Sequence, residues 1–164
     1  MTEEAETMAD LGVSIVTLEP MRVASVRAIS ETPERDAWKK ARAWALPRGL
    51  LDDVEKHPVF GFNNPDPSPH RKEYGYEFWI RIGPEIEPEG EIEAKEFAGG
   101  LYAVTTCEVR GDPWETIPAA WKRLLDWCRS SRYRMGNHQW LEKVRDPRAS
   151  EGDLVLDLYL PIEE

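Results

Sequence analysis

The sequence has few cysteines, and they lie far apart. Cys107 and Cys128 are the two cysteines among 164 residues. They form no C-x-x-C pair, and they have no zinc-ligand spacing with the histidines at 57, 70 and 138. We therefore interpret both thiols as small buried apolar side chains, one on a predicted strand and one on a predicted helix. We expect no metal ion or other cofactor.

The chain also lacks an excess of basic residues and any long apolar run. Its formal net charge is -10, and the acids are spread along its length. This charge argues against binding to a phosphate backbone, so we expect no direct nucleic-acid partner. No apolar run approaches the roughly 18 to 20 residues that a membrane-spanning helix needs, and the first residues are acidic where a signal peptide would be basic. We expect a cytoplasmic protein without a membrane partner.

Aromatic residues, in contrast, are plentiful. Seven Trp, five Tyr and four Phe occur in a chain long enough for one domain. Rigid aromatic rings provide surfaces on which planar ligands stack, although core packing can also use them. We predict a disordered tail at 1–11 and a single domain at 12–164.

The order strand, strand, helix, strand, strand is predicted twice, over about 12–83 and 91–162. Alternation of apolar and polar residues predicts strands in the first repeat at 13–18, 21–29, 59–62 and 73–82, and in the second at 92–97, 101–109, 138–144 and 153–161. Thr32-Pro33 and Asp112-Pro113 each predict a helix start. Gly99-Gly100 and Glu19-Pro20 predict turns between adjacent strands.

This pattern predicts an α+β fold. Two such units form an antiparallel sheet with helices on one side, because each half alone would leave its sheet face unburied. We expect a ligand groove between the pseudo-two-fold halves.

Residues 138–144 place an acid inside a strand-like run. Alternation puts His138, Trp140, Glu142 and Val144 on one face. If protein covers that face, Glu142 becomes a general base or an anchor for a cationic ligand. The alternative is an exposed edge strand with a solvated carboxylate.

The duplicated layout and four stretches resemble the GyrI-like small-molecule-binding proteins. The stretches are 74–79, 95–104, 138–142 and 158–162, and the resemblance covers about 12–162. These proteins are similar to the effector-binding domains of multidrug-responsive transcription regulators. In that family a buried Glu on the penultimate strand, surrounded by aromatic residues, contacts lipophilic cations, and the matching residue is Glu142. Val144 departs from the Tyr that the wider family often has two places later.

The resemblance also implies candidate site residues. A stand-alone branch of the family is associated with hydrolysis of cyclopropane-bearing, DNA-alkylating natural products, using the same acid with neighbouring Trp and Tyr residues. We accordingly predict Glu142 and Tyr102 as catalytic. The predicted ligand contacts are Trp140, Tyr76, Trp79, Tyr159 and His138. A structural role is the alternative for Tyr76, Trp79, Tyr102, Tyr159 and His138, whereas Trp140 is favoured as a contact because it shares the face of Glu142.

Three functions remain open at this point. The chain could be a detoxifying hydrolase in which Glu142 activates water to open a cyclopropane. It could instead bind or sequester lipophilic aromatic cations without turnover. Thirdly, it could inhibit DNA gyrase through its acidic surface. We expect either a monomer or a homodimer.

Overall fold

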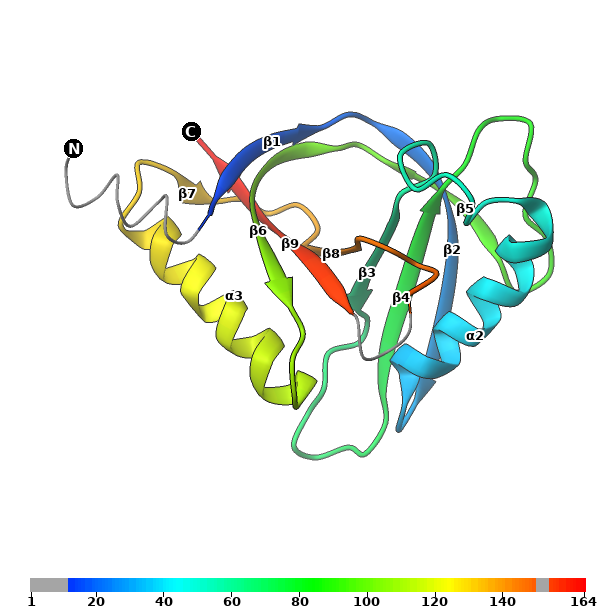
Figure 1. Cartoon of the computed structure of the whole chain (residues 1–164), viewed down its shortest axis with the longest axis horizontal. Helices are drawn as coiled ribbons and strands as arrows, with labels where there is room; N and C mark the ends of the chain where they lie inside the picture. The colour runs from blue at the N-terminus through cyan, green and yellow to red at the C-terminus, as the bar shows by residue number, and fades with distance from the viewer. Residues whose placement is uncertain (1–11, 150–153) are drawn as a thin grey trace. The chain divides into compact units, whose positions relative to one another are not determined.

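The computed structural model describes residues 12–149 and 154–164, so the predicted tail at 1–11 lies outside the described residues. The chain forms two compact units (Figure 1). Unit 1 contains the chain up to Glu19 together with Gly99–Glu164, and unit 2 contains Pro20–Ala98.

Unit 2 is a four-stranded antiparallel sheet with a helix on one face. Its strands are β2 (Met21–Ser30), β3 (Val59–Asn63), β4 (Tyr74–Arg81) and β5 (Glu93–Phe97), in the order β3-β4-β2-β5. Helix α2 (Pro33–Ala45) is followed by the 3-10 turn η1 (Leu46–Arg48). Trp38 of α2 packs on Phe78 of β4, with ring centroids 5.1 Å apart. Helix α2 therefore covers the sheet face that carries Phe78, and β4 is a central strand, as predicted.

Unit 1 repeats this arrangement. Its strands are β1 (Ser14–Leu18), β6 (Gly100–Glu108), β8 (Leu141–Val144) and β9 (Val155–Glu163), in the order β1-β6-β9-β8, and β7 (Arg134–Met135) pairs with β9. The buried Leu124 of helix α3 (Pro113–Arg129) belongs to the same hydrophobic core as Ala103 of β6 and Leu158 of β9. The predicted α+β fold with duplicated units is confirmed, and Cys107 and Cys128 are both free and buried in this core.

The predicted hairpins, however, are wrong. Strand β1 pairs with β6, and β5 pairs with β2, so each unit takes one strand from the other sequence repeat. The Gly99-Gly100 pair serves close packing: a Cβ on Gly99 would lie 2.2 Å from the Leu18 carbonyl oxygen, and Gly99 has φ +80°.

The predicted strand at 138–144 is shorter than expected. Strand β8 begins at Leu141, and His138, Gln139 and Trp140 precede it in irregular backbone. Hydrogen bonds from other elements hold this segment: the Tyr102 hydroxyl donates to the Gln139 carbonyl, and His138 Nε2 lies 2.7 Å from the Leu101 carbonyl oxygen. Side-chain alternation along a strand therefore holds only from Leu141 onward.

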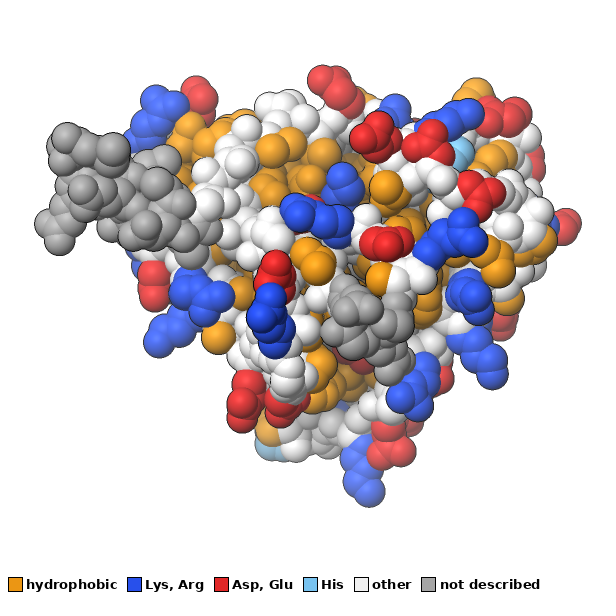
Figure 2. Space-filling view, viewed as in Figure 1, with side chains coloured by type: hydrophobic (Ala, Val, Ile, Leu, Met, Phe, Trp, Pro, Cys, Tyr) orange, Lys and Arg blue, Asp and Glu red, His pale blue; other side chains and the backbone are white. Residues whose placement is uncertain are grey.

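No helix among the described residues combines the length and apolar character needed to cross a bilayer. On the face drawn in Figure 2, acidic and basic side chains are interspersed. This face therefore has no continuous acidic surface.

The two predicted helix starts differ in their capping. At α3, Asp112 Oδ1 accepts a hydrogen bond from the Trp114 backbone N–H at 2.9 Å, as expected for an N-cap. At α2, Thr32 occupies the N-cap position, but among the described residues its side chain caps no backbone N–H. Its hydroxyl donates instead to Asp36, at 3.3 Å.

We predict that Asp112→Ala lowers the free energy of unfolding by about 1 kcal/mol, because it leaves a helix N–H without its acceptor. Thr32→Ala is the matched control and should cost less than half as much. Urea unfolding followed by circular dichroism measures both. Equal losses would contradict the capping difference seen in the structure.

Candidate functional site

Glu77 is the only buried acidic side chain among the described residues, with 1% of its surface exposed. It lies on the central strand β4, next to Phe78. Neighbouring residues on a strand point to opposite faces, and Phe78 points toward α2. Glu77 therefore points to the sheet face that α2 does not cover.

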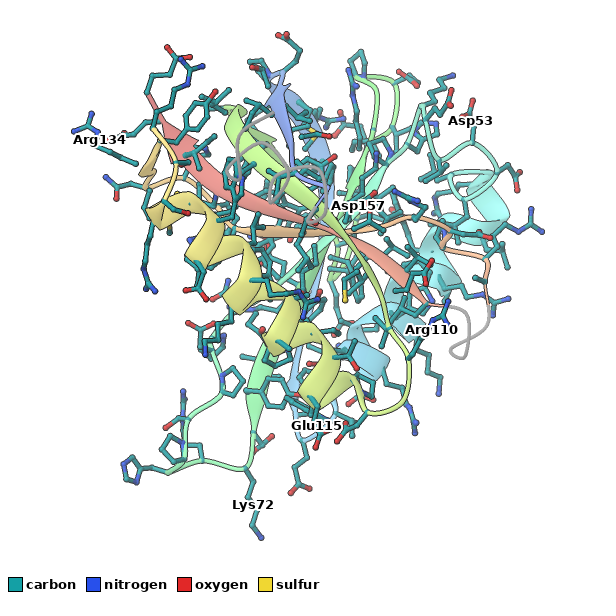
Figure 3. All side chains as sticks on the ribbon, turned by 60° about the vertical axis from the view of Figure 1, so that its left-hand side comes forward. Asp53, Lys72, Arg110, Glu115, Arg134 and Asp157 are labelled. Atoms are coloured by element: carbon teal, nitrogen blue, oxygen red, sulfur yellow. The ribbon has the colours of Figure 1, made fainter. Side chains whose placement is uncertain are left out.

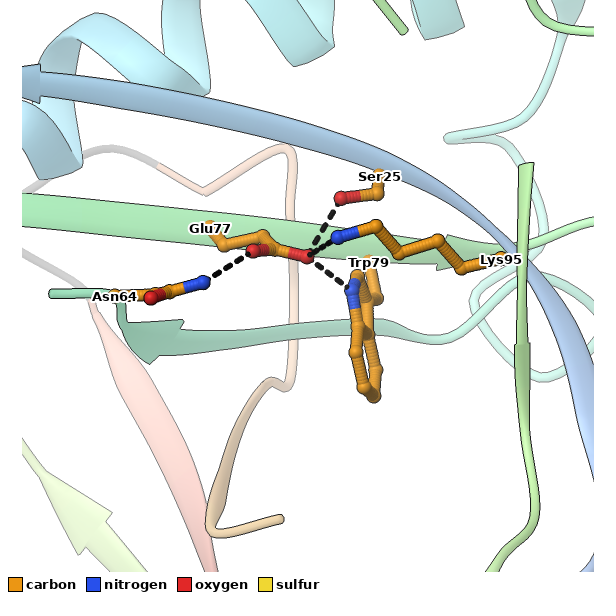
Figure 4. Close-up of polar contacts among 5 residues, drawn as sticks. All are labelled: Ser25, Asn64, Glu77, Trp79 and Lys95. Atoms are coloured by element: carbon orange, nitrogen blue, oxygen red, sulfur yellow. Dashed lines mark hydrogen bonds and ion pairs between the residues drawn. The ribbon is translucent and has the colours of Figure 1, made fainter. Parts of the chain in front are cut away.

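Four hydrogen-bond donors converge on the Glu77 carboxylate (Figure 4). Oε2 accepts from Ser25 Oγ at 2.6 Å, Trp79 Nε1 at 2.7 Å and Lys95 Nζ at 2.9 Å. Oε1 accepts from Asn64 Nδ2 at 3.0 Å. The donors come from β2, from β4 itself, from β5 and from the residue after β3, so the whole sheet of unit 2 contributes to this site.

These contacts determine the charge of Glu77. Burial alone would raise its pKa, but the hydrogen bonds from Ser25, Lys95, Asn64 and Trp79 outweigh burial and hold the pKa below its ordinary value. The Glu77 carboxylate is therefore ionised at neutral pH, and the ammonium of Lys95 balances its charge.

Trp79, which donates to this carboxylate, also packs on two further aromatic rings. The Trp79 ring is 4.8 Å from Phe62 and 5.2 Å from Phe97, measured between centroids. All three side chains are buried. The predicted ligand contact Trp79 thus belongs to a site that combines one buried acid with three rings.

The predicted catalytic residue Glu142 has a different environment. It lies on β8 and is half-buried. Its Oε2 accepts a hydrogen bond from Trp121 Nε1 at 3.1 Å, and the Trp121 ring is 5.2 Å from the ring of Trp140. The structure therefore brings Glu142 together with the predicted contact Trp140 and with Trp121 of α3, which was not among the predicted site residues.

Tyr102, His138 and Tyr159 form a second aromatic group in unit 1. The Tyr102 ring lies 4.8 Å from His138 and 5.5 Å from Tyr159. Burial raises the pKa of the Tyr102 hydroxyl, so this group stays protonated near neutrality and donates to the Gln139 carbonyl. A Cβ on Gly100 would lie 2.7 Å from the His138 ring, so this packing requires the glycine.

The sheet of unit 1 separates these two groups. Glu142 pairs with Leu158, which belongs to the core beneath α3, so Glu142 is on the α3 side. Tyr159 is the neighbour of Leu158 on β9, and Tyr102 is the neighbour of Ala103, another residue of that core, on β6. Both tyrosines therefore point to the opposite face. The structure does not bring Glu142 and Tyr102 together within unit 1.

A similar separation applies to the two candidates on β4. The Tyr76 ring lies 5.0 Å from Phe78 and on the α2 side of the sheet, whereas Trp79 is on the Glu77 side. Tyr76 thus contributes to the packing under α2.

The sequence reasoning missed Glu77 as a site residue. The only local signal was an acid between aromatic residues on a central strand, whereas its partners Ser25 and Lys95 lie 52 and 18 residues away.

A related but more exposed arrangement occurs on β9, where Asp157 (Figure 3) accepts hydrogen bonds from Thr106 and Arg145, each at 2.8 Å. Among the described residues, no three His, Cys, Asp or Glu side chains converge as metal ligands.

This duplicated α+β fold, with acids beside aromatic rings, is that of a small-molecule-binding domain. The chain belongs to the GyrI-like family, since the model of the GyrI-like small molecule binding domain matches residues 12–163. No curated protein matches the chain.

Solved structures share this fold at low sequence identity. EcmrR in complex with DNA has a TM-score of 0.66 and 15% identity over 93% of this chain, which covers 57% of the EcmrR chain. A hydrolase from Listeria innocua has a TM-score of 0.62 and 11% identity, over 92% of this chain and 91% of that one. SAV2435, bound to tetraphenylphosphonium, has a TM-score of 0.54 and 11% identity, over 92% and 93% of the two chains.

The network at Glu77 predicts a pH dependence of stability. The folded protein lowers the pKa of Glu77 from its ordinary value of 4.5. The stabilisation that the ionised carboxylate contributes is therefore present above pH 4.5 and is lost as the pH falls through the folded-state pKa. Glu77→Gln should therefore lower the free energy of unfolding by about 1 to 3 kcal/mol at pH 7, and the difference from wild type should shrink at pH 3.

Thermal or urea unfolding of both proteins at the two pH values measures this effect. Glu115→Gln is the control, because Glu115 is an exposed acid in the first turn of α3 (Figure 3). A Glu77→Gln deficit that is unchanged at pH 3 would show that the lost stability does not come from the ionised carboxylate.

Proposed function

We propose that this chain binds lipophilic aromatic cations, with Glu142, Trp121 and Trp140 as the contact residues. The observation that carries this proposal is the Trp121 indole N–H held on the Glu142 carboxylate, with the Trp140 ring beside Trp121. Trp140 is 36% exposed, and Trp121 and Glu142 are half-buried. A ligand can therefore reach all three without unfolding the sheet.

The physical basis is a combination of charge and ring contact. A carboxylate attracts a cationic centre, and indole faces attract cations while stacking on planar groups. The Trp121 hydrogen bond fixes the carboxylate beforehand, which reduces the entropy lost on binding. The neighbour with bound tetraphenylphosphonium supports a lipophilic cation as the ligand class.

We expect tetraphenylphosphonium to quench the intrinsic Trp fluorescence saturably, with a dissociation constant on the micromolar scale. Glu142→Gln should weaken binding by about 1 to 3 kcal/mol, the scale for losing a charged partner. Triphenylphosphine oxide, a neutral probe of similar shape, should bind equally to the wild type and the variant.

Two matched tryptophan variants test whether the cation binds at Glu142. Trp121→Phe removes the N–H that holds Glu142 and should weaken binding, whereas Trp114→Phe, at a residue on the same helix that is 63% exposed, should not. If Glu142→Gln and Trp121→Phe both bind the cation as the wild type does, the proposed site is wrong.

A second candidate function is hydrolysis of cyclopropane-bearing genotoxic compounds. The fixed orientation of the Glu142 carboxylate favours it, because a general base must point at the water it activates. In this reaction Glu142 takes a proton from water, and the water oxygen bonds to a cyclopropane carbon. The strained C–C bond breaks, and its electron pair passes into the attached ring system, which is then protonated. Tyr102, on the other face of the sheet, has no part in this version of the reaction.

Turnover separates the two candidates. If Glu142 is a general base, Glu142→Gln should lower the hydrolysis rate of a cyclopropane-bearing substrate by roughly 100-fold or more while affinity for a neutral substrate is retained. Chromatography of the ring-opened product measures the rate. A variant that hydrolyses at the wild-type rate but binds cations weakly would leave only the binding function.

The remaining expectation, inhibition of DNA gyrase, would need an acidic docking face. The mixture of acidic and basic side chains in Figure 2 does not favour it for that face. A supercoiling assay with and without the chain tests this alternative directly.

A further inference from the structure

The buried carboxylate of Glu77 has one donor that differs from the other three. Ser25 and Trp79 are buried and Asn64 is half-buried, and all three are neutral donors. Lys95 is charged, and 41% of its side chain is exposed, compared with 2% of the Glu77 side chain. The lysine side chain therefore runs from solvent to the carboxylate.

Lys95 lies where its ammonium can be displaced from Glu77. It lies on β5, which among the described residues pairs only with β2. Glu93, Ala94 and Glu96 on the same strand are exposed. The ammonium can leave Glu77 by rotation of its own side chain, without breaking the β2–β5 pairing. Because 41% of the Lys95 side chain is exposed, water can solvate the ammonium as it moves away from Glu77.

What remains after the lysine leaves is a receptor for a cation. Ser25, Asn64 and Trp79 still hold the carboxylate, and the burial of Glu77 strengthens its attraction for any positive charge that replaces the ammonium. A buried charge without a counter-ion is costly, so an incoming cation is favoured. The Trp79 ring, which donates to the same carboxylate oxygen as Lys95, packs on Phe62 and Phe97, so apolar surface adjoins this position.

We propose that Glu77 is a second cation-binding site, closed in the free protein by Lys95, and that an organic cation with an apolar body binds there by displacing the Lys95 ammonium. This site lies wholly within unit 2. It is separate from the Glu142 site in its residues and does not depend on it.

The test is performed with tetraphenylphosphonium in a Glu142→Gln background, so that Glu142 does not contribute. Adding Lys95→Met keeps the length of the side chain and removes the competing ammonium. Calorimetry should then show about fivefold or tighter binding, the factor that corresponds to a partly exposed ion pair. Further addition of Glu77→Gln should abolish this gain. Equal affinity with and without Lys95→Met, or a gain that survives Glu77→Gln, would overturn the proposal.

A measurement on the unmodified protein covers the case in which these variants do not fold. Reductive methylation with formaldehyde and cyanoborohydride labels accessible amines, and peptide mass spectrometry reports each lysine. Tetraphenylphosphonium should increase the labelling rate of Lys95, because displacement exposes its amine. Lys72, an exposed residue on the β3–β4 connection (Figure 3), is the internal control and should be unaffected. A Lys95 rate that stays constant or falls would contradict displacement.

Triphenylphosphine oxide completes the design, since it lacks the charge. It should neither bind more tightly to the Lys95→Met protein nor change Lys95 labelling. If it does both, apolar contact and not Glu77 accounts for the binding, and the proposed cation site is wrong. Loss of the Glu142 effect in the earlier experiment would leave this result unaffected, so the two proposals fail independently.

Discussion

The exchange of edge strands between the two repeats constrains the rest of this structure. Strand β1 precedes the first repeat's helix but pairs with β6, and β5 precedes the second helix but pairs with β2. Without the exchanged strand, β2 and β6 would each expose a row of unpaired backbone groups at a sheet edge. Neither repeat therefore completes a sheet from its own residues. Lys95 reaches Glu77 because of this exchange, since β5 is the strand that carries it.

Side-chain alternation then decides which candidate residues can act together. In unit 1, Glu142 shares the α3 face with Leu158, while Tyr102 and Tyr159 share the opposite face. In unit 2, Phe78 and Tyr76 pack under α2, while Glu77 and Trp79 lie on the other side. If the register of a strand shifted by one residue, its side chains would exchange the two faces of the sheet. Unit 1 therefore holds the half-buried Glu142 together with two indoles, and unit 2 holds the buried Glu77 together with a cluster of three aromatic rings.

Much of the local structure could be predicted from the sequence, because it depends on neighbouring residues. The Asp112-Pro113 helix start and the alternating strands are examples. The strand partners could not be predicted, since Gly99-Gly100 reads as a hairpin turn, whereas the glycine at 99 accommodates the Leu18 carbonyl. The predicted start of this strand, at His138, was also wrong. Tyr102 and Leu101, more than 30 residues earlier, form hydrogen bonds with the segment at 138–139 and hold it outside β8. Glu77 was missed for the same reason: its burial and its donors exist only after four strands have assembled.

The choice of lysine at position 95 bears on how the site at Glu77 can work. An arginine would form a two-pronged, planar contact with a carboxylate and would be hard to displace, whereas an ammonium is a compact, strongly hydrated point charge on a flexible stem. Lys95 shares the single oxygen Oε2 with Ser25 and Trp79, so its departure leaves that oxygen with two donors. Glu77 therefore keeps its orientation when Lys95 moves. A carboxylate that is held in place independently of its counter-ion can exchange that counter-ion, and this is what distinguishes the site from an ion pair that only stabilises the fold.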